Sequence, residues 1–401
     1  MGLLNAMDSS LRILYAAGPG DVIGTYRHWK AGRDDPAQVA ITYSGQFYDL
    51  CKELDARGYV ISTNPKRERI TEDNLIIEHR PLRFARGPMP LYHLGQIWHG
   101  VRLAMSAKRF GADVVFVADG TTHWFMLGLV RMMGARVVPS LHSMLWPKHL
   151  GTGGVINRMI LWLNARFFRR GASAVLSISD DVSQQVRSML NGRPLHIIPF
   201  LPNYRPESFG DGFPLPEART PFRVFFAGRI EQNKGVFDLL EIARQFKAQG
   251  RMDIEFDLCG DGSQLEPLRS AAIEAGIQEQ FHCHGHSSKP FMREMYARSH
   301  VIIVPTTTAE GFNKVVAEGI LAGRPVITSS ICPALEYVKE GVLEVPPNDR
   351  AAYAQAILKL KDDPALYEAK WRGCCAVRGQ FYDVSRGWRA AAKTAVSLGK
   401  P

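Results

Sequence analysis

Residues 301–330 read VIIVPTTTAEGFNKVVAEGILAGRPVITSS. The apolar run VIIVPT has the length of a buried strand, and RPVITSS at the other end has the same character. Between them a polar loop leads into NKVVAEGILAG, whose apolar residues recur at helical spacing. A strand, a helix and a second strand in this order predict a parallel βαβ unit.

The same alternation continues on both sides of this unit. One series runs from LRILYAAGPG to LHIIPFLPNY, and a second restarts with FRVFFAGR. Proline and glycine interrupt the pattern between the two series. The sequence therefore predicts two Rossmann-like α/β domains, residues 1–203 and 222–373, joined by a linker at 204–221. Ligands of such sheets bind at the carboxyl ends of the strands, so we expect a site in a cleft between the domains.

The composition is that of an ordinary globular protein. The chain has 401 residues, of which 46% are hydrophobic and 22% charged, and this excludes a disordered or fibrous protein. No apolar run reaches the roughly 18–20 residues that span a bilayer, and the first residues lack the pattern of a secretory signal. The six cysteines are scattered without a CxxC pair, so we expect reduced thiols and a cytoplasmic location.

Positive charge is concentrated in the first half of the chain. Residues 1–200 contain 24 Lys and Arg against 15 Asp and Glu, whereas residues 201–401 contain 25 against 24. Such an excess suggests an anionic partner. Segment 155–170 combines apolar residues at helical spacing with four arginines, so it either lies on an anionic membrane surface or packs on the core. We expect no nucleic-acid partner, because basic and aromatic residues do not interleave and no recognised module is present.

Two glutamates flank the start of the helix within 301–330. Glu310 lies in the preceding loop and Glu318 on the helix, with seven residues between them. Eight helical steps rise about 12 Å. The two carboxylates either grip hydroxyls at opposite ends of an extended ligand or are ordinary solvated side chains. The free N–H groups at the helix start favour a phosphate between them.

Two cations follow the first strand of the second series. Arg229 and Lys234 come after FFAG, where they either neutralise a leaving diphosphate or are surface charges. In LCGDGSQL, Gly260 and Gly262 permit a tight turn before the next helix.

Four blocks in this order resemble a known family. FFAGRIEQNKG, DLCGDGSQL, VIIVPTTTAEGFNKVVAEGILAG and RPVITSS are similar to the retaining GT-B glycosyltransferases with a Glu-x7-Glu motif, which include bacterial mannosyltransferases and sucrose synthase. The likeness covers residues 222–360. The first domain is similar more loosely, through its opening strand and glycine turn, SLHSMLWP and ASAVLSISDDV. The resemblance also implies a C-terminal helix within 374–401 that crosses back to the first domain.

The resemblance implies a role for each matching residue. Glu310 would contact the hydroxyls of the donor sugar and Glu318 the ribose, while Arg229 and Lys234 would hold the diphosphate. The remaining donor-site residues would be Gly311, Phe312 and Asn313 at the helix start, His142 from the first domain, and Gly18, Gly20 and Gly24 in a glycine loop. GPGDVIG spreads its glycines, whereas the family usually has an adjacent pair.

The implied activity is transfer of a sugar from a nucleoside-diphosphate sugar to a hydroxyl of a glycan or lipid-linked acceptor. The acceptor would attack the face that the diphosphate leaves, so the anomeric configuration is retained without an enzyme nucleophile. No Asp-x-Asp motif lies in a suitable loop, so we expect no metal, and no cofactor besides the donor substrate. The resemblance further implies cell-surface polysaccharide biosynthesis, with the basic domain at the inner face of the cell membrane. The alternative is a nucleotide-sugar epimerase of the same architecture, which needs no acceptor.

Three candidate acceptor positions and a group of histidines leave more than one interpretation open. His28 follows the glycine loop, and His123 and Trp124 follow the strand DVVFVAD, so each either meets the acceptor or packs within the domain. The histidines in FHCHGH either line the base pocket, face solvent or form a metal site.

Overall fold

The computed structural model of the protein describes residues 10–84, 88–146, 154–216, 220–308 and 310–399. Their contacts divide the chain into two compact units. The first unit is drawn from Met1–Asp35, Ile41–Leu201 and Val384–Pro401, and the second from Pro36–Ala40 and Pro202–Asp383. Each unit is built on its own predominantly parallel sheet with helices on both faces, so the predicted pair of Rossmann-like α/β domains is confirmed.

The first sheet has the strand order β3-β4-β2-β1-β5-β6-β7-β8 within the described residues. All neighbours pair in parallel except β3 and β4. The strands are β1 (Arg12–Ala17), β2 (Arg57–Ser62), β3 (Glu68–Glu72), β4 (Leu75–His79), β5 (Val114–Ala118), β6 (Arg136–Leu141), β7 (Val175–Ser177) and β8 (Ile197–Pro199).

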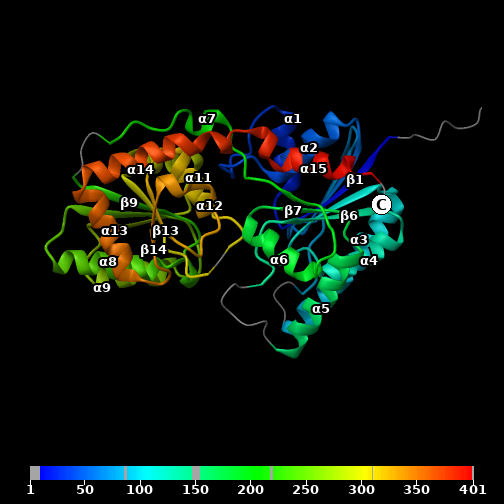
Figure 1. Cartoon of the computed structure of the whole chain (residues 1–401), viewed down its shortest axis with the longest axis horizontal. Coiled ribbons are helices and arrows are strands. Elements are labelled where there is room, and N and C mark those ends of the chain that lie inside the picture. The colour runs from blue at the N-terminus through cyan, green and yellow to red at the C-terminus, as the bar shows by residue number, and fades with distance from the viewer. Residues whose placement is uncertain (1–9, 85–87, 147–153, 217–219, 309, 400–401) are drawn as a thin grey trace, which may run out of the picture. The chain divides into compact units, whose positions relative to one another are not determined.

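Helices cover both faces of this sheet, with α1, α2 and α15 on one face and α3 and α4 on the other (Figure 1). The helical segments of the first unit are α1 (Val22–Lys30), α2 (Tyr43–Glu53), α3 (Met89–Phe110), η1 (Trp124–Leu127), α4 (Gly128–Met132), α5 (Val155–Arg170), α6 (Asp180–Leu190), η5 (Val384–Arg386) and α15 (Trp388–Ser397).

The second sheet has the order β11-β10-β9-β12-β13-β14, and its described strands all pair in parallel. They are β9 (Phe222–Ala227), β10 (Ile254–Cys259), β11 (Phe281–Gly285), β12 (Val301–Val304), β13 (Val326–Ser329) and β14 (Val342–Val345). The helical segments of this unit are α7 (Pro206–Phe209), η2 (Gln232–Lys234), α8 (Val236–Ala248), α9 (Leu265–Glu274), α10 (Lys289–Arg298), α11 (Lys314–Leu321), α12 (Leu335–Val338), η3 (Lys339–Gly341), α13 (Arg350–Asp362), α14 (Pro364–Val377) and η4 (Arg378–Phe381).

The central strands are short apolar runs because both of their faces are covered. Every residue of β5, β12 and β13 is buried, and these strands contain almost only β-branched and other apolar side chains. Strands buried on both faces have this composition in parallel sheets. The βαβ unit predicted from residues 301–330 is therefore β12, α11 and β13, in parallel register.

The pair β3 and β4 forms an antiparallel edge of the first sheet that the sequence analysis did not anticipate. In β3, polar residues predominate and most positions are exposed. An edge strand with charged side chains resists pairing with other chains, but its weak apolar alternation gives little signal in the sequence.

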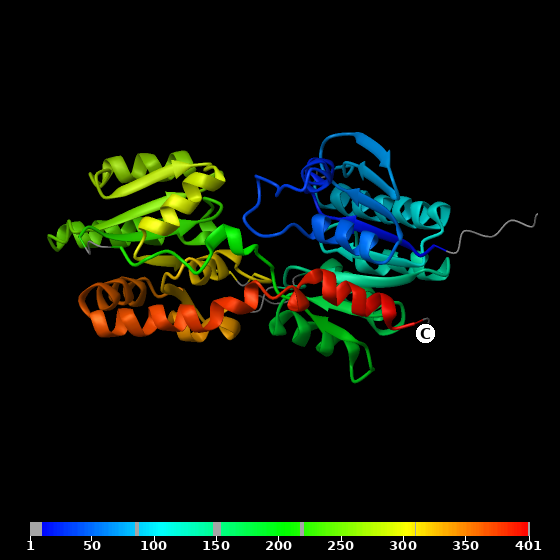
Figure 2. The ribbon, with the colours of Figure 1, turned by 90° about the horizontal axis from the view of Figure 1, so that it is seen from above.

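The C-terminal helix α15 packs within the first unit, although it follows the whole second unit in sequence. Figure 2 shows α15 beside α2. The Trp388 side chain is fully buried, its rings lie 5.2 Å from Tyr15 and 5.5 Å from Phe116, and its Nε1 donates to Ser140 Oγ at 2.8 Å. The preceding helix α14 ends at Val377 without a break at residue 374.

Within the described ranges, no helix is both long enough and apolar enough to cross a bilayer.

Replacing Trp388 with Ala should destabilise the first unit, because a buried indole leaves a large cavity and Ser140 loses its donor. A loss of about 3–5 kcal/mol is expected for a buried Trp. Urea unfolding would measure it, with Trp162→Ala as the control, because Trp162 is 60% exposed on α5. Equal stability of the two variants would show that α15 is not part of the cooperative unit.

Candidate active site

The loops that follow β9 and β12 are pressed together at the carboxyl edge of the second sheet. A Cβ atom at Gly235 would lie only 2.2 Å from the carbonyl oxygen of Pro305. The carbonyl oxygen of Asn233 accepts hydrogen bonds from the Thr307 amide at 3.1 Å and from the Thr306 hydroxyl at 3.3 Å. Glycine is required at residue 235, both for this close approach and because its φ is +72°.

This packing brings Lys234 and Glu310 into contact, although they lie 76 residues apart. Lys234 Nζ forms an ion pair with Glu310 Oε1, and Asn313 Nδ2 donates to Glu310 Oε2 at 3.0 Å. Asn313 is in turn held by Cys332, whose thiol lies 3.1 Å from Asn313 Oδ1. Three residues predicted for the donor site thus form one cluster at the start of α11.

The protonation of Lys234, the cation of this cluster, depends on its surroundings. Burial, and then the nearby charge of Arg229, lowers the pKa of Lys234 to about 8. The Arg229 side chain itself is exposed. An anion bound beside both cations would favour protonated Lys234, so it would bind with proton uptake near this pH.

The turn after β10 packs against the loop that follows β9. A Cβ at Gly260 would lie 1.7 Å from the Gly228 carbonyl oxygen, and one at Gly262 would lie 2.3 Å from that of Ile230. The Ile230 amide donates to the Asp261 carbonyl oxygen at 2.9 Å. The two glycines predicted to form a tight turn therefore let two loops pack backbone to backbone.

Glu318 lies on the buried side of α11. Its carboxylate accepts hydrogen bonds from the hydroxyls of Tyr296, at 2.7 Å, and Tyr204, at 3.4 Å. Burial raises the pKa of Glu318, while these bonds and the charge of Lys314 act in the opposite direction. Glu318 is thus an internal carboxylate with two tyrosine donors, and each of its oxygens keeps capacity for one more donor.

The start of α11 is built from the other predicted donor-site residues. Gly311 and Phe312 are buried, and the Phe312 ring packs against Tyr337 and Phe381. Asn313 is the N-cap residue, yet no side chain of the described residues caps the helix. Amides at an uncapped helix start attract anions.

The glycine loop of the first unit joins β1 to α1. Gly18 and Gly20 have no atom within 4 Å of a Cβ position, so the loop surface is open there. Gly24 lies in the first turn of α1, where its amide donates to the capping Asp21 side chain at 2.8 Å. The Thr63 amide donates to the Gly18 carbonyl oxygen, and the Ser62 hydroxyl donates to that of Gly20, which ties the loop to the end of β2.

His142 follows β6 at the same edge of the first sheet. Its Nε2 lies 2.9 Å from Ser140 Oγ, and its ring packs against Tyr43 and Phe200. Its amide donates to Asp119 Oδ1 at 3.2 Å. Asp119 was not among the predicted residues, although its position directly after a buried strand was a signal.

The acceptor candidates after β5 differ in exposure. Trp124 is only 7% exposed and packs against Phe168, which favours the packing interpretation for it. His123 Nε2 lies 3.1 Å from His93 Nδ1, and its ring stacks on Phe125. Burial, and then His93, lowers the pKa of His123 to about 4, so it is neutral at pH 7.

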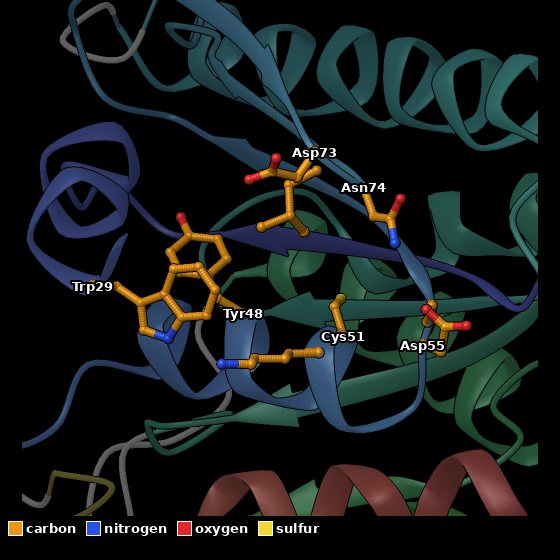
Figure 3. Close-up of a pocket in the computed structure, with 9 residues that line it drawn as sticks. Trp29, Tyr48, Cys51, Asp55, Asp73 and Asn74 are labelled. Atoms are coloured by element: carbon orange, nitrogen blue, oxygen red, sulfur yellow. The ribbon is translucent and has the colours of Figure 1, made fainter. Parts of the chain in front are cut away.

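His28 lies near the end of α1 and is half-buried. Its neighbour Trp29 lines a separate cavity of about 340 Å³ with Tyr48, Asp55 and Asn74 (Figure 3). Trp29 Nε1 donates to Asp49 Oδ1 at 2.8 Å. This indole is thus held by α2 rather than by the glycine loop.

The histidines of β11 do not form a metal cluster with other described residues, and no group of potential metal ligands is found in those parts of the chain. His284 Nε2 lies 2.7 Å from the buried Asp257 carboxylate. Arg298 donates to the same carboxylate at 2.7 Å. His284 therefore takes part in an ion-pair network within the second unit.

The sequence is similar to two glycosyltransferase families and to curated glycosyltransferases. Residues 212–372 match the family described as glycosyl transferases group 1, and residues 46–200 match glycosyltransferase family 4. Among curated relatives, the alpha-D-kanosaminyltransferase of Streptomyces kanamyceticus is 23% identical, over 69% of this chain and 75% of the relative. The 2-deoxystreptamine glucosyltransferase of the same organism is 24% identical, over 80% and 89%.

A comparison with solved structures gives the same fold. HepE of Anabaena, solved in complex with UDP, superposes with a TM-score of 0.69 at 17% identity, covering 97% of this chain and all of HepE. At this identity the likeness concerns the fold.

Glu318→Gln is expected to stabilise the second unit at pH 8. A carboxyl group whose pKa is raised in the folded state favours folding at low pH, and this contribution is lost as the pH rises. At pH 8 the buried carboxylate is charged and carries the cost of burial, whereas the amide of the variant does not, so the variant should unfold at a higher temperature than the wild type.

The advantage of Glu318→Gln should shrink as the pH falls and vanish near pH 3, because both folded and unfolded wild type are largely protonated at this carboxyl group only well below its usual pKa of about 4.3. Thermal unfolding across this range would measure it, with the exposed Glu279→Gln as control. Lower stability of Glu318→Gln at pH 8 would show that the charged form is the better partner of the two tyrosines.

Proposed function

Because the chain is a glycosyltransferase built of two Rossmann-like domains of the GT-B type, we propose that it transfers a sugar from a nucleoside-diphosphate sugar, with retention of configuration. The observation that carries this proposal is the cluster of Lys234, Glu310 and Asn313 at the uncapped start of α11. It provides a cation, a carboxylate and free helix amides within one small site. The acceptor is proposed to be a glycan or a lipid-linked hydroxyl in cell-surface polysaccharide biosynthesis.

In this proposal, the cluster binds both the diphosphate and the sugar of the donor. Without ligand, the Glu310 carboxylate neutralises Lys234 and accepts from Asn313. The diphosphate would take Lys234 and Arg229 as its cations and the α11 amides as donors. Glu310 would then be released from Lys234 and free to accept hydrogen bonds from the sugar hydroxyls.

The reaction follows from this arrangement. The bond between the anomeric carbon and the diphosphate oxygen breaks, and the acceptor oxygen forms its bond on the same face. The acceptor proton passes to the departing phosphate oxygen. Arg229, Lys234 and the helix start stabilise the negative charge that develops on the diphosphate. This route requires no enzyme nucleophile, and the two cations take the place of a metal ion.

The proposal is tested by binding of UDP, GDP and ADP, with UDP as the first choice because HepE was solved with it. A nucleotide at about 100 times its Kd should stabilise the wild type by about 2.7 kcal/mol. Arg229→Ala should weaken the binding at least tenfold, as expected for loss of a charge-assisted hydrogen bond. Arg244→Ala is the matched control, because Arg244 is an exposed arginine of α8 in the same unit.

The anomeric configuration of the product distinguishes retention from inversion, and the identity of the product distinguishes transfer from epimerisation. With the nucleotide sugar that binds and an acceptor extract, NMR of the product should show the anomeric configuration of the donor. An inverted product would contradict retention. Release of an epimerised nucleotide sugar from the donor alone would contradict transfer and favour the epimerase.

We further propose that α5 holds the first unit against the cytoplasmic face of an anionic membrane. The second half of α5 is anchored by buried Ala165, Phe167 and Phe168, whereas its first half leaves the core (Figure 1). Four apolar residues there are 55–81% exposed: Val155, Ile156, Met159 and Trp162. The arginines of 155–170 supply the charge that such an interfacial helix needs.

Replacing Ile156, Met159 and Trp162 with Ser should reduce binding to phosphatidylglycerol vesicles at least tenfold, because each burial in the interface is worth about 1–3 kcal/mol. Vesicle flotation measures this binding. The control is Met252→Ser with Ile273→Ser, two exposed apolar residues of the second unit. Equal loss in both variants would contradict a specific role of α5.

A further inference from the structure

Two adjoining cavities lie in the first unit between α3 and the edge strands β3 and β4. Their volumes are about 480 and 550 Å³, within the range of small-molecule sites. They share Arg69, Glu78, Arg80 and Arg102 in their linings, and eight arginines line one or both. We call the two cavities together the arginine groove. None of the residues predicted for sugar transfer lines it.

The carboxylates of the arginine groove neutralise little of this charge. Glu78 binds Arg80 through both of its oxygens, at 2.8 and 2.9 Å, and also accepts from the Tyr59 hydroxyl. Glu68 pairs with Arg27, outside the groove, at 2.6 Å. Both acidic side chains of the lining are therefore already engaged.

Several arginines of the groove have no direct ion-pair partner among the described residues, although the charge of Glu78 acts on Arg69 and Arg102. Within the described parts of the chain, no hydrogen bond or ion pair holds the side chains of Arg67, Arg69, Arg83, Arg102 or Arg109. The Arg69 guanidinium lies over the Tyr59 ring at 5.8 Å, which orients it without neutralising it. Like charges repel, so an anion bound among these guanidinium groups would lower the electrostatic repulsion between them.

The positive charges of the groove affect the pKa values of neighbouring side chains. Burial, and then the charges of Arg80 and Arg102, lowers the pKa of His99 to about 4. Burial and the charge of Arg80 also lower the pKa of Arg102. In both cases burial is the largest cause and the positive charge of neighbouring arginines adds to it, so the charges of the groove act on the groups around them.

Several arginine side chains together suit an anion that carries more than one negative charge, such as a phosphate group. The planar guanidinium donates two parallel N–H bonds to phosphate oxygens, and several such groups match a diphosphate or a phosphomonoester with two charges. Arg80 is already oriented by Glu78 and by Ser106, whose Oγ lies 3.0 Å from it. Arg80 is therefore held in one orientation, and the less constrained arginines can move toward an anion bound beside it.

The arginine groove continues into an apolar surface on the same helix. Trp98 lines the groove and is 46% exposed. Leu94 lies one helical turn before it and is 54% exposed, and Leu91 lies two turns before it and is 40% exposed. A ligand with a phosphate group and a hydrocarbon part would meet matching chemistry along α3. An interfacial Trp between the two parts is typical of membrane contact.

We propose that the arginine groove is a binding site for phosphate groups that carry at least two negative charges, separate from the donor site. The two sources of this chemistry are a lipid headgroup and a soluble phosphorylated molecule. The apolar continuation along α3 favours the lipid.

The test uses the full chain with Arg229→Ala and Lys234→Ala, so that the proposed donor site does not contribute. Calorimetry with inorganic pyrophosphate should show binding in this background. Adding Arg69→Gln and Arg102→Gln should weaken it at least tenfold, as expected for the loss of two charged donors. Adding Arg33→Gln and Arg193→Gln, which removes equal charge from exposed positions of the same unit, should leave it unchanged.

Vesicles distinguish the sources. The vesicle arm adds the three α5 substitutions to Ser described above to the background chain, so that α5 does not contribute. If this chain binds phosphatidic acid vesicles but not phosphatidylcholine vesicles, and the Arg69→Gln and Arg102→Gln pair abolishes the binding, the source is a lipid. Pyrophosphate binding without vesicle binding assigns the groove to a soluble ligand. Unchanged pyrophosphate binding in that pair, or stronger competition by a single-stranded oligonucleotide than by pyrophosphate, would overturn the proposal.

Folding and the proposed function are monitored separately. The Arg69→Gln and Arg102→Gln pair removes repulsion, so its unfolding temperature without ligand should equal or exceed that of the background chain. With Arg229 and Lys234 intact, the pair should bind UDP as the wild type does. Loss of pyrophosphate binding with intact UDP binding therefore concerns the arginine groove alone, and loss of UDP binding in the wild type concerns the donor site alone.

Discussion

The close backbone packing of three loops at the edge of the second sheet holds together the side chains of the proposed donor site. Gly235 lies against Pro305, and Gly260 lies against Gly228, at separations that exclude any side chain. Because these loops cannot move apart without losing their hydrogen bonds, the side chains that they carry have fixed neighbours. Lys234 meets Glu310 for this reason, and a cation and a carboxylate that are remote in sequence become one group at the start of α11.

The same helix shows how function and stability oppose each other. Glu318 is buried and has a raised pKa, a cost that the hydroxyls of Tyr296 and Tyr204 offset only in part. An internal carboxylate without full compensation destabilises a fold. Such strain persists at sites where a ligand supplies what is missing. The ribose hydroxyls of a donor nucleotide would supply further hydrogen bonds, which is consistent with the role proposed for Glu318.

The sequence predicted the fold well where burial produces a strong pattern. The βαβ unit of residues 301–330 was predicted because β12 and β13 are buried on both faces, and the alternation around it gave both sheets. It could not predict β3, whose charged edge lacks apolar alternation, although this strand forms one wall of the arginine groove. It also could not pair Glu318 with Tyr296, because a contact between α11 and α10 depends on how the helices pack and leaves no trace in spacing. Asp119 was missed although it follows a buried strand, because a single carboxylate after a strand is common.

The uneven charge of the chain now has a structural explanation. The second half is almost neutral, yet it contains the cations proposed for the donor, so nucleotide binding does not require the excess in the first half. That excess is partly gathered in the arginine groove, where five arginines have no direct ion-pair partner among the described residues. Some surface arginines elsewhere, such as Arg27 and Arg187, pair with Glu68 and Asp180. Unpaired arginines that line adjoining cavities can act together on one anion, whereas scattered surface arginines cannot. Since α5 and α3 both expose apolar residues beside basic ones, the first unit has the chemistry to meet an anionic amphiphile, whereas the donor site is proposed in the second unit.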